Sequence, residues 1–387
     1  MMDGLAWLVV APVALPVVVF AAECIAGFAG AGAARATPAP PPFVVIMPAH
    51  DEAAGIGRAI TAVRGQLRPC DRLLVVADNC TDDTAAIARG LGAEVVERRN
   101  SVERGKGHAL AFGCAALAGS PPDIVIVLDA DCWPEPDALL RLAAAAATGD
   151  VVQGRYELAT PAGAGTAAQV SGFAFAVKNV VRQRGLQRLG GPALLQGSGM
   201  AFPWAVFRGA PLASANLVED MELGIALARA GDRIRFLDGA RFGSAASSRD
   251  ATVTQRTRWE HGTLATGWRA APGLWGAALR GRPRLALLAL DLIVPPLALL
   301  AALVLAAIGI AGGAALIGGS VLPVLAALTL GMMLSGAVLL GWLAVGRQHL
   351  SPATLAGVPA YMLWKLPIYL RLAGRRQRLW VRTHRDV

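Results

Sequence analysis

The chain has 387 residues, of which 55% are hydrophobic and only 16% are charged, and its formal net charge is +9. A soluble domain carries about a quarter charged residues, so this composition argues against a wholly soluble protein and places part of the chain in lipid. Much of the arginine lies beside apolar stretches, and no recognition-helix, zinc-finger or RNA-binding signature is present. We therefore attribute the positive charge to attraction for anionic lipid head groups and expect no nucleic-acid partner.

Three uncharged stretches account for the hydrophobic excess, and they cover residues 5–22, 292–311 and 321–345. Each is long enough to cross roughly 30 Å of hydrocarbon as a helix. The first stretch also resembles the apolar part of a cleaved signal peptide, but the four residues before it lack the basic start of such peptides. We therefore predict one membrane-spanning helix before the central region and two after it.

Basic residues gather on one side of these predicted spans. Arg35 follows the first span, Arg280, Arg282 and Arg284 precede the second, and Arg347 and a basic tail follow the third. The positive-inside rule then places the N-terminus outside and the central region in the cytoplasm, in an integral protein of the cytoplasmic membrane. We predict an anchor in residues 1–35, a cytoplasmic domain in 36–270 and a C-terminal membrane region in 271–387. Within the last, residues 355–370 suit either the membrane interface or a packed terminal helix.

The central region alternates apolar runs with helical patterns. A proline-rich linker at 36–42 leads to predicted strands and helices, which alternate from residue 43 to residue 128. The strands are 43–47, 72–77, 94–97 and 124–128, and the helices are 53–66, one from residue 81, and 106–118. This order predicts an α/β fold with a mostly parallel sheet, whose ligands bind beyond the carboxyl ends of the strands. Those ends correspond to residues 48–52, 78–83 and 129–133.

The second half of the central region is less regular. We predict helices at 165–184, 221–230 and 251–267, an extended segment at 194–203 and a strand at 233–237. The five cysteines show no paired spacing, so we expect small buried side chains rather than disulfides or metal ligands. They are Cys24, Cys70, Cys80, Cys114 and Cys132.

Asp129-Ala130-Asp131 follows the strand at 124–128 directly. Two carboxylates one residue apart at a strand end can hold a divalent cation and, through it, a diphosphate. Their hard oxygen ligands suit Mg²⁺ or Mn²⁺. An aspartate at a strand end is also common as a turn former or helix cap, so the pair alone is a weak signal.

Further acidic residues follow the two earlier strands. Asp51 and Glu52 come after the first strand and Asp78 after the second, where carboxylates can bond to a ribose and a base edge. Helix capping is the alternative explanation, and it applies best to Thr81 or Asp82. Lys106 lies between glycines in a loop before a helix and can meet a nucleotide, although the loop lacks the spacing of a Walker motif.

Two clusters lie further along the chain. Glu219 and Asp220 precede a helical pattern, and Asp220 can act there as a general base or, alternatively, as an N-cap. Gln255, Arg258 and Trp259 share one face of a predicted helix. That face offers an amide and a guanidinium for phosphate and an indole for stacking, or an anchor at the bilayer surface.

In this order the motifs resemble the membrane-bound, inverting family 2 glycosyltransferases, which include cellulose synthase, hyaluronan synthase, poly-N-acetylglucosamine synthase and ceramide glucosyltransferase. The resemblance covers residues 43–259 and the flanking membrane helices. It implies a GT-A-type, Rossmann-like nucleotide-sugar domain with one N-terminal and two C-terminal transmembrane helices and interfacial helices. The matching residues are 48–52, 78–82, 105–107, 129–131, 197–199, 219–220, Gln255, Arg258 and Trp259.

The resemblance also implies a role for each matching residue. Asp51, Glu52, Asp78 and Lys106 bind the nucleotide sugar, Asp131 binds the metal, and Asp129 binds the metal together with the diphosphate or sugar. Asp220 is the base that deprotonates the acceptor. Gln255, Arg258 and Trp259 hold the diphosphate, and Trp259 also lines the acceptor site with Gly197, Ser198, Gly199 and Glu219. The implied partners are a nucleotide sugar, with uridine as its base, a lipid or saccharide acceptor and membrane lipids.

Three spans are few for a processive polysaccharide synthase, so we favour a single transfer to a lipid or lipid-linked acceptor. A processive synthase remains an alternative, as does a membrane scaffold with an inactive transferase domain. A synthase of the polyprenyl-phosphate sugar type shares the early motifs but not the Gln-x-x-Arg-Trp pattern. A transporter fits poorly because the spans hold few polar residues. Asp291 is the exception, and it suggests either a functional site or an interfacial position near Arg284.

Overall fold

A computed structural model describes the backbone of residues 2–30, 39–160, 163–216, 218–245, 249–352 and 354, and the side chains of these ranges except at 2 and 249–260. The chain divides into two compact units. The sheet unit comprises the described residues within 31–159 and 192–262, and the helical unit comprises those within 2–30, 160–191 and 263–354. We describe each unit by itself. The predicted linker residues 36–38, the interfacial segment 355–370 and the basic tail lie outside the described residues.

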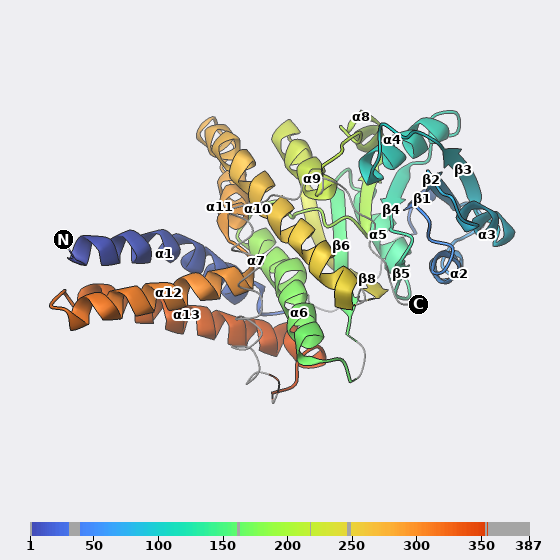
Figure 1. Ribbon diagram of the computed structural model, residues 1–387. Coiled ribbons are helices and arrows are strands. Elements are labelled where there is room, and N and C mark those ends of the chain that lie inside the picture. Colours follow the sequence, from blue (N-terminus) through green and yellow to red (C-terminus); the bar gives the residue numbers. More distant parts are fainter. Residues whose placement is uncertain are drawn as a thin grey trace. The chain divides into compact units, whose positions relative to one another are not determined.

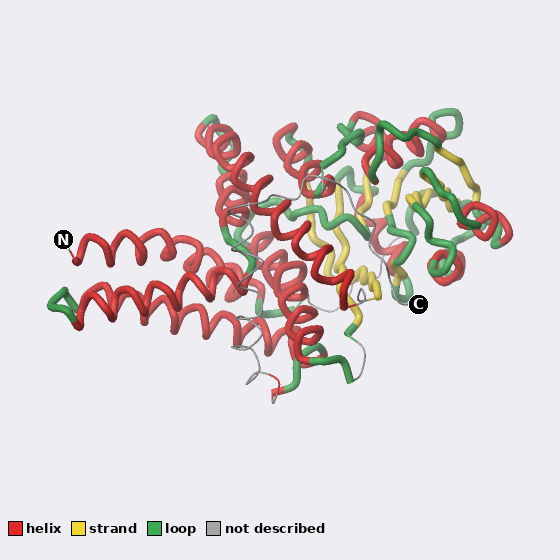
Figure 2. The backbone as a smooth tube through the Cα atoms, in the orientation of Figure 1, coloured by secondary structure: helices red, strands yellow, loops and turns green. Residues whose placement is uncertain are grey.

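The sheet unit is built on an eight-stranded mixed sheet with the strand order β3-β2-β1-β4-β7-β6-β8-β5. Four of its seven strand pairs are parallel: β1 with β2, β1 with β4, β2 with β3, and β6 with β8. Figure 2 shows its strands and helices by colour. Its elements are β1 (Phe43–Ala49), α2 (Ile56–Arg64), β2 (Arg72–Asp78), α3 (Thr84–Gly90), β3 (Glu94–Arg98), α4 (Lys106–Leu117), β4 (Ile124–Val127), β5 (Cys132–Pro134), α5 (Ala138–Ala146), β6 (Val151–Ala159), β7 (Met200–Pro203), α8 (Trp204–Gly209), α9 (Glu219–Ala230) and β8 (Ile234–Ala245).

The apolar runs explain the centre of this sheet. All residues of β1 and β4 are buried, as expected for parallel strands covered on both faces. Helix α2 buries Ile56, Ala59, Ile60 and Val63, which are spaced to form one helical stripe. The predicted strands and helices between residues 43 and 128 are therefore present, and their carboxyl ends lie at one edge of the sheet.

The second half differs from the sequence expectation in several places. The predicted helix 165–184 consists of α6 (Thr166–Ala176), a π-helical turn η1 (Val177–Val181) and α7 (Arg182–Arg188), which belong to the helical unit. The predicted helix 251–267 extends over α10 (Arg249–Leu279), and its residues fall in both units. Strands β5 and β6 and helices α5 and α8 have no counterpart among the elements predicted from the sequence.

The helical unit contains three helices that are long and apolar enough to cross a membrane: residues Asp3–Gly27 of α1 (Met2–Gly27), α12 (Leu297–Leu316), and Leu322–Gln348, which spans α13 (Leu322–Val345) and η2 (Gly346–Gln348). Helix α1 packs against α7, α12 and α13, and α12 packs against α13 (Figure 1). The predicted second span, 292–311, is displaced. Pro295 and Pro296 separate α11 (Arg284–Ile293) from α12, because proline cannot continue the α11 hydrogen-bond pattern.

A buried ion-pair cluster joins three helices of the helical unit. The Arg182 side chain donates to Glu23 Oε2 and to Asp291 Oδ1, both at 2.6 Å, and to the Asp291 carbonyl at 3.1 Å. Helices α1 and α7 can approach this closely because Gly27 and Gly185 meet the partner backbone without a side chain. The Asp291 carboxylate therefore has Arg182 as its buried partner, and its suggested interfacial position near Arg284 stays a prediction.

Candidate active site

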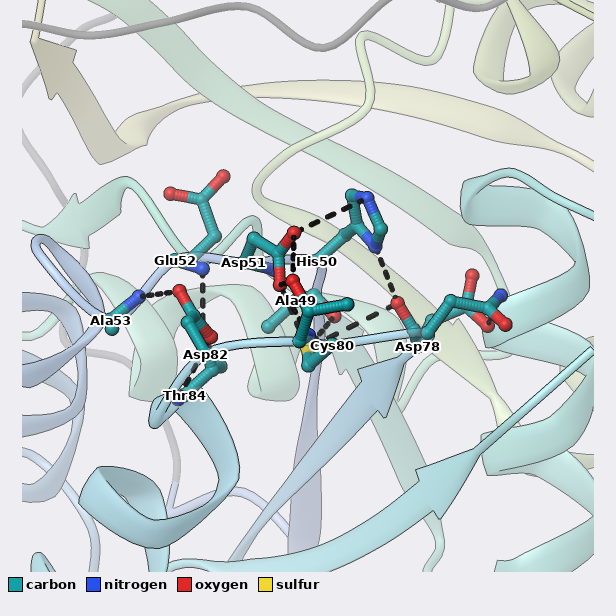
Figure 3. Close-up of polar contacts among 11 residues, drawn as sticks. Ala49, His50, Asp51, Glu52, Ala53, Asp78, Cys80, Asp82 and Thr84 are labelled. Carbon is teal, nitrogen blue, oxygen red and sulfur yellow. Dashed lines mark hydrogen bonds and ion pairs between the residues drawn. The ribbon is translucent and has the colours of Figure 1, made fainter. Parts of the chain in front are cut away.

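The loops after β1 and β2 are tied together by the acidic residues at their starts (Figure 3). Asp51 has a left-handed backbone (φ 51°) and its Oδ1 accepts the Thr81 amide at 2.6 Å. Asp82 accepts the amides of Ala53 and Thr84 at 3.1 and 3.0 Å. Burial acts to raise the pKa of Asp51, but the Thr81 amide bond and neighbouring His50 outweigh it and lower that pKa. Asp51 is therefore held as a carboxylate.

The ligand atoms of Asp51, Cys80 and Asp82 lie within 4.8 Å of one another, but their contacts explain this clustering without a metal. Both carboxylates accept backbone amides, and the Cys80 thiol donates to the Ala49 carbonyl at 3.4 Å. Burial raises the pKa of that thiol. The Glu52 carboxylate points away from this group in Figure 3.

Asp78 is buried and pairs with Arg98, whose Nη1 lies 2.8 Å from Asp78 Oδ1. The same oxygen accepts the Asn79 side-chain amide at 2.9 Å, and His50 Nδ1 lies 2.7 Å from the Asp78 carbonyl. The β2–β3 register places Arg98 directly opposite Asp78. Arg98 is not among the site residues predicted from the sequence, because only the strand pairing identifies it as the partner of this carboxylate.

Asp129 and Asp131 come together at the end of β4, as predicted. Their carboxylate oxygens and the Cys132 sulfur lie within 4.8 Å of one another. Burial, with the nearby Asp131 and Asp129 carboxylates, raises the pKa of the Cys132 thiol, so it stays protonated and is a poor metal ligand. Two half-buried carboxylates without a thiolate fit Mg²⁺ or Mn²⁺.

Lys106, at the first turn of α4, links this acidic pair to the loop before β7. Its Nζ lies 2.5 Å from Asp129 Oδ1 and 2.5 Å from the Gly197 carbonyl. Burial acts to lower the pKa of Lys106, but the carboxylates of Asp129 and Glu219 outweigh it and raise that pKa. The lysine is therefore a fixed positive charge at the predicted diphosphate position.

Glu219 and Asp220 form the first turn of α9, where their charges complement the helix dipole. They line a pocket together with Lys106, Gly107, Leu110, Met200, Leu212 and Leu223. Burial, followed by the neighbouring Asp220, raises the pKa of Glu219 to about 7, although Lys106 acts in the opposite sense. The pocket thus holds two acidic side chains facing one lysine.

The predicted Gly197-Ser198-Gly199 segment lies beside Lys106, Asp129 and Asp220. Gly197 has φ +89°, and a Cβ there would lie 3.1 Å from Asp220 Oδ2 and 3.3 Å from Lys106 Nζ. Ser198 is fully buried, and its Oγ accepts the Asp129 amide at 3.2 Å. Gly199 packs against Phe242, which leaves no room for a side chain. Ser198 therefore holds the backbone of Asp129 in place through a hydrogen bond, and Gly199 allows the close packing against Phe242.

Gln255, Arg258 and Trp259 lie on α10, but their side chains are outside the described residues. The five cysteines are free. Cys24, Cys114 and Cys132 are buried as expected, whereas Cys80 is half-buried and Cys70 is exposed. The expectation of burial is therefore wrong for Cys70.

Residues 40–262, more than half of the chain, match the family model described as "Glycosyltransferase like family 2". The chain belongs to this family. Its predicted GT-A-type fold is confirmed by a mannosyltransferase from Pyrobaculum calidifontis solved with GDP-Man and Mn²⁺, which aligns with a TM-score of 0.61 at 17% identity over 97% of this chain and 100% of that one.

Two curated relatives are more similar in sequence over shorter stretches. Glucosyl-3-phosphoglycerate synthase of Mycolicibacterium paratuberculosis is 36% identical over 115 residues, which are 28% of this chain and 34% of that protein. An uncharacterized glycosyltransferase of Mycobacterium tuberculosis is 36% identical over 112 residues, covering 29% of this chain and 47% of that one. The chain thus spans about a third to a half of the relatives it matches, and their substrates describe those proteins alone.

Proposed function

We propose that this family member is an inverting glycosyltransferase that moves a sugar from a nucleotide-diphosphate sugar, with UDP as the favoured carrier, to a lipid or saccharide acceptor at the inner face of the membrane. The observation that carries the proposal is the arrangement of Lys106, Asp129 and Asp220. Lys106 is a fixed cation beside the candidate metal ligand Asp129, which suits binding of the donor diphosphate. Asp220 lines the same cavity as Lys106, and its carboxylate suits a base that acts on the acceptor.

On the donor side, Asp129 and Asp131 would hold Mg²⁺ or Mn²⁺, which neutralises charge on the leaving diphosphate. Lys106 is placed to bind the same diphosphate through its ammonium group. Asp51 and Asp78, at the ends of β1 and β2, would position the nucleoside. The diphosphate would also be bound by Gln255, Arg258 and Trp259.

On the acceptor side, Asp220 would take the proton of the attacking hydroxyl group. The acceptor oxygen then forms the new bond to the anomeric carbon while the bond from that carbon to the diphosphate oxygen breaks. A single displacement inverts the configuration and needs no covalent enzyme intermediate.

The helical unit supports a membrane location, because three of its helices are long and apolar enough to span a bilayer. With one such helix before the sheet unit and two after it, we favour a single transfer to a lipid-linked acceptor over chain polymerisation. The positive-inside pattern favours a cytoplasmic sheet unit. We propose the cytoplasmic membrane as the location.

The test is a donor screen with purified protein in detergent and added membrane lipids. We expect one nucleotide sugar to release its diphosphate in the presence of Mn²⁺ or Mg²⁺ and not in EDTA. NMR of the first-formed product should show an inverted anomeric centre. Retention of configuration, or release that is indifferent to metal, would contradict the proposal. A series of products of increasing length would show that the protein is a processive synthase and would contradict single transfer.

A further inference from the structure

A buried carboxamide lies behind the candidate active site. Gln153 is on β6, an inner strand of the sheet unit, opposite Met200 of β7, and its exposed fraction is 0%. Such positions are normally apolar, because a buried carboxamide is costly unless its donor and acceptor groups are hydrogen-bonded. The hydrogen-bond partners of Gln153 therefore indicate what this side chain does.

The Gln153 side chain bonds to the backbone on both sides of Gly197. Its Nε2 donates to the Ser198 carbonyl at 2.9 Å, and its Oε1 accepts the Gln196 amide at 2.8 Å. Nε2 also donates to the Gly154 carbonyl at 2.8 Å, so both ends of the carboxamide are hydrogen-bonded. One buried side chain thus joins the backbone around Gly197 to β6.

This support matters because the segment around Gly197 belongs to no helix or strand. Gly197 and Gly199 have φ values of 89° and 66°, and glycine changes its backbone conformation easily. Gly199 is held by backbone bonds to Val127 and Gly154, at 3.0 and 2.8 Å. The groups that Gln153 binds come before Gly199 in the chain, so the position of Gly197 depends on this side chain.

The same segment contacts both the donor side and the acceptor side of the candidate active site. The Gly197 carbonyl lies 2.5 Å from Lys106 Nζ, and the Ser198 hydroxyl accepts the Asp129 amide at 3.2 Å. On the acceptor side, a Cβ at Gly197 would lie 3.1 Å from Asp220 Oδ2. A shift of this segment would therefore change how Asp220 is placed relative to Lys106.

We propose that Gln153 is a positioning residue for glycosyl transfer. By holding the Gly197 backbone, it sets the distance between Asp220 and Lys106, the proposed base and the proposed diphosphate ligand. Gln153 is buried and does not line the pocket, so it acts through the segment rather than on a substrate. A misplacement of about 1 Å can cost about a hundredfold in rate. This role rests on the proposed function, from which Asp220 and Lys106 take their parts.

Gln153→Met tests the role in the full-length protein in detergent, because methionine keeps the length of the side chain but lacks the amide. Gln153→Asn is a second variant, in which the amide is one methylene too short for the same bonds. The matched control is Gln66→Met. Gln66 also bonds to backbone of the sheet unit, to the Glu135 carbonyl at 2.9 Å and the Leu139 amide at 3.4 Å, but it does not line the pocket.

The first measurement is the rate of metal-dependent diphosphate release. We expect kcat of both Gln153 variants, per folded molecule, to fall about tenfold or more, while the KM for the donor stays within about threefold. Donor binding is retained because Lys106 keeps its direct contact with Asp129. The Gln66 variant should keep its kcat, whatever its loss of Tm.

The second measurement is hydrogen exchange of the segment. The Gln196 amide should exchange faster in the Gln153 variants, because its acceptor is removed. The Gly199 amide should keep its protection, because it donates to the Val127 carbonyl. Unchanged exchange at Gln196 would show that Gln153 does not hold the segment and would overturn the proposal.

A lower Tm with unchanged kcat in the Gln153 variants would show a purely structural role, and would overturn the positioning role while leaving the transferase proposal intact. An equal loss of kcat in the Gln66 variant would overturn it as well, because the effect would then not depend on the segment. If the unchanged protein releases no diphosphate from any nucleotide sugar, the proposed function itself fails, and the positioning role fails with it. The two failures are therefore distinguishable by the activity of the unchanged protein.

Discussion

The sheet unit and the helical unit each bury a cation between carboxylates, but the two clusters differ in how they are closed. Arg182 makes three short contacts to Glu23 and Asp291, and all three side chains are less than one-tenth exposed. Lys106 contacts Asp129 and the Gly197 carbonyl, and the Asp129 side chain is 29% exposed. In the first cluster one guanidinium is shared by two buried carboxyl groups, whereas Lys106 of the second cluster also lines a small cavity with Asp220.

Similar charged groups can therefore serve either as a cross-link between helices or as a binding site. A planar guanidinium with fixed partners joins three helices and leaves little room for a ligand. An ammonium group on a flexible stem, between a candidate metal ligand and a backbone carbonyl, can exchange its contacts for those of a diphosphate. We therefore expect mutations in the helical cluster to affect stability first, and mutations in the sheet cluster to affect activity first.

Among the substitutions in the two charged clusters and the metal site, the largest expected effect is from Asp131→Asn. Loss of a metal ligand should remove several kcal/mol of transition-state stabilisation, so kcat/KM should fall by about a thousandfold. Binding of Mn²⁺, followed by electron paramagnetic resonance, should weaken in parallel, while the Tm in EDTA stays close to that of the unchanged protein. Full activity with unchanged Mn²⁺ binding would remove Asp131 from the metal site.

Arg182→Met tests the closed cluster. It leaves the carboxylates of Glu23 and Asp291 buried without their cation, which typically costs about 3–5 kcal/mol. Thermal unfolding in detergent should show a clearly lower Tm. The control is Arg89→Met, which breaks the exposed Arg89–Glu97 pair and should change the Tm little. Equal effects of the two substitutions would show that burial does not distinguish these pairs.

Gly197→Ala tests the close approach of the Gly197 backbone to Asp220 and Lys106. Its Cβ would approach both Asp220 and Lys106, so we expect kcat/KM to fall about tenfold or more, in addition to a backbone cost of about 1 kcal/mol. Gly231→Ala is the matched control, because Gly231 also has a positive φ (+112°) but no neighbour near its Cβ. Both variants should lose stability, and only the first should lose activity.

The features of the fold and the site differ in how far they can be predicted from the sequence. Asp129, Asp131 and Lys106 were predictable, because polar residues that follow buried parallel strands meet at one edge of a sheet. The pairing of Arg98 with Asp78 was not, since it depends on the register of β2 and β3. The displaced second span has another cause: hydropathy sums the composition and overlooks the break that Pro295 and Pro296 impose.

The helical pattern at 165–184 is also predictable from the sequence, but the unit to which the helix belongs is not. Periodicity identifies a helix without indicating which unit it packs against, and the structure assigns α6 and α7 to the helical unit. Arg182 and Glu23 are 159 residues apart, so nothing local in the sequence indicates their contact. The stability of that unit therefore depends on contacts that a motif search does not reveal.

The smallest expected effect concerns pH. Because the folded pKa of Glu219 is raised to about 7 from 4.5, the folded protein holds this proton where the unfolded chain has lost it. The Tm of the metal-free protein should therefore decline as pH rises from about 4.5 through 7, and Glu219→Gln should weaken that decline. Glu222→Gln, on the exposed side of the same turn, is the control. An unchanged decline in Glu219→Gln would show that other groups cause it.

In the proposed function, Asp220 of the sheet unit is the base that takes the proton of the acceptor hydroxyl group. The most direct test compares Asp220→Asn with Glu222→Gln, which removes a carboxylate from the same helical turn without touching that pocket. We expect kcat of Asp220→Asn to fall by about 10²–10⁴ while donor affinity is retained, and Glu222→Gln to remain active. Turnover by Asp220→Asn within a few-fold of the unchanged protein would show that Asp220 is not the base.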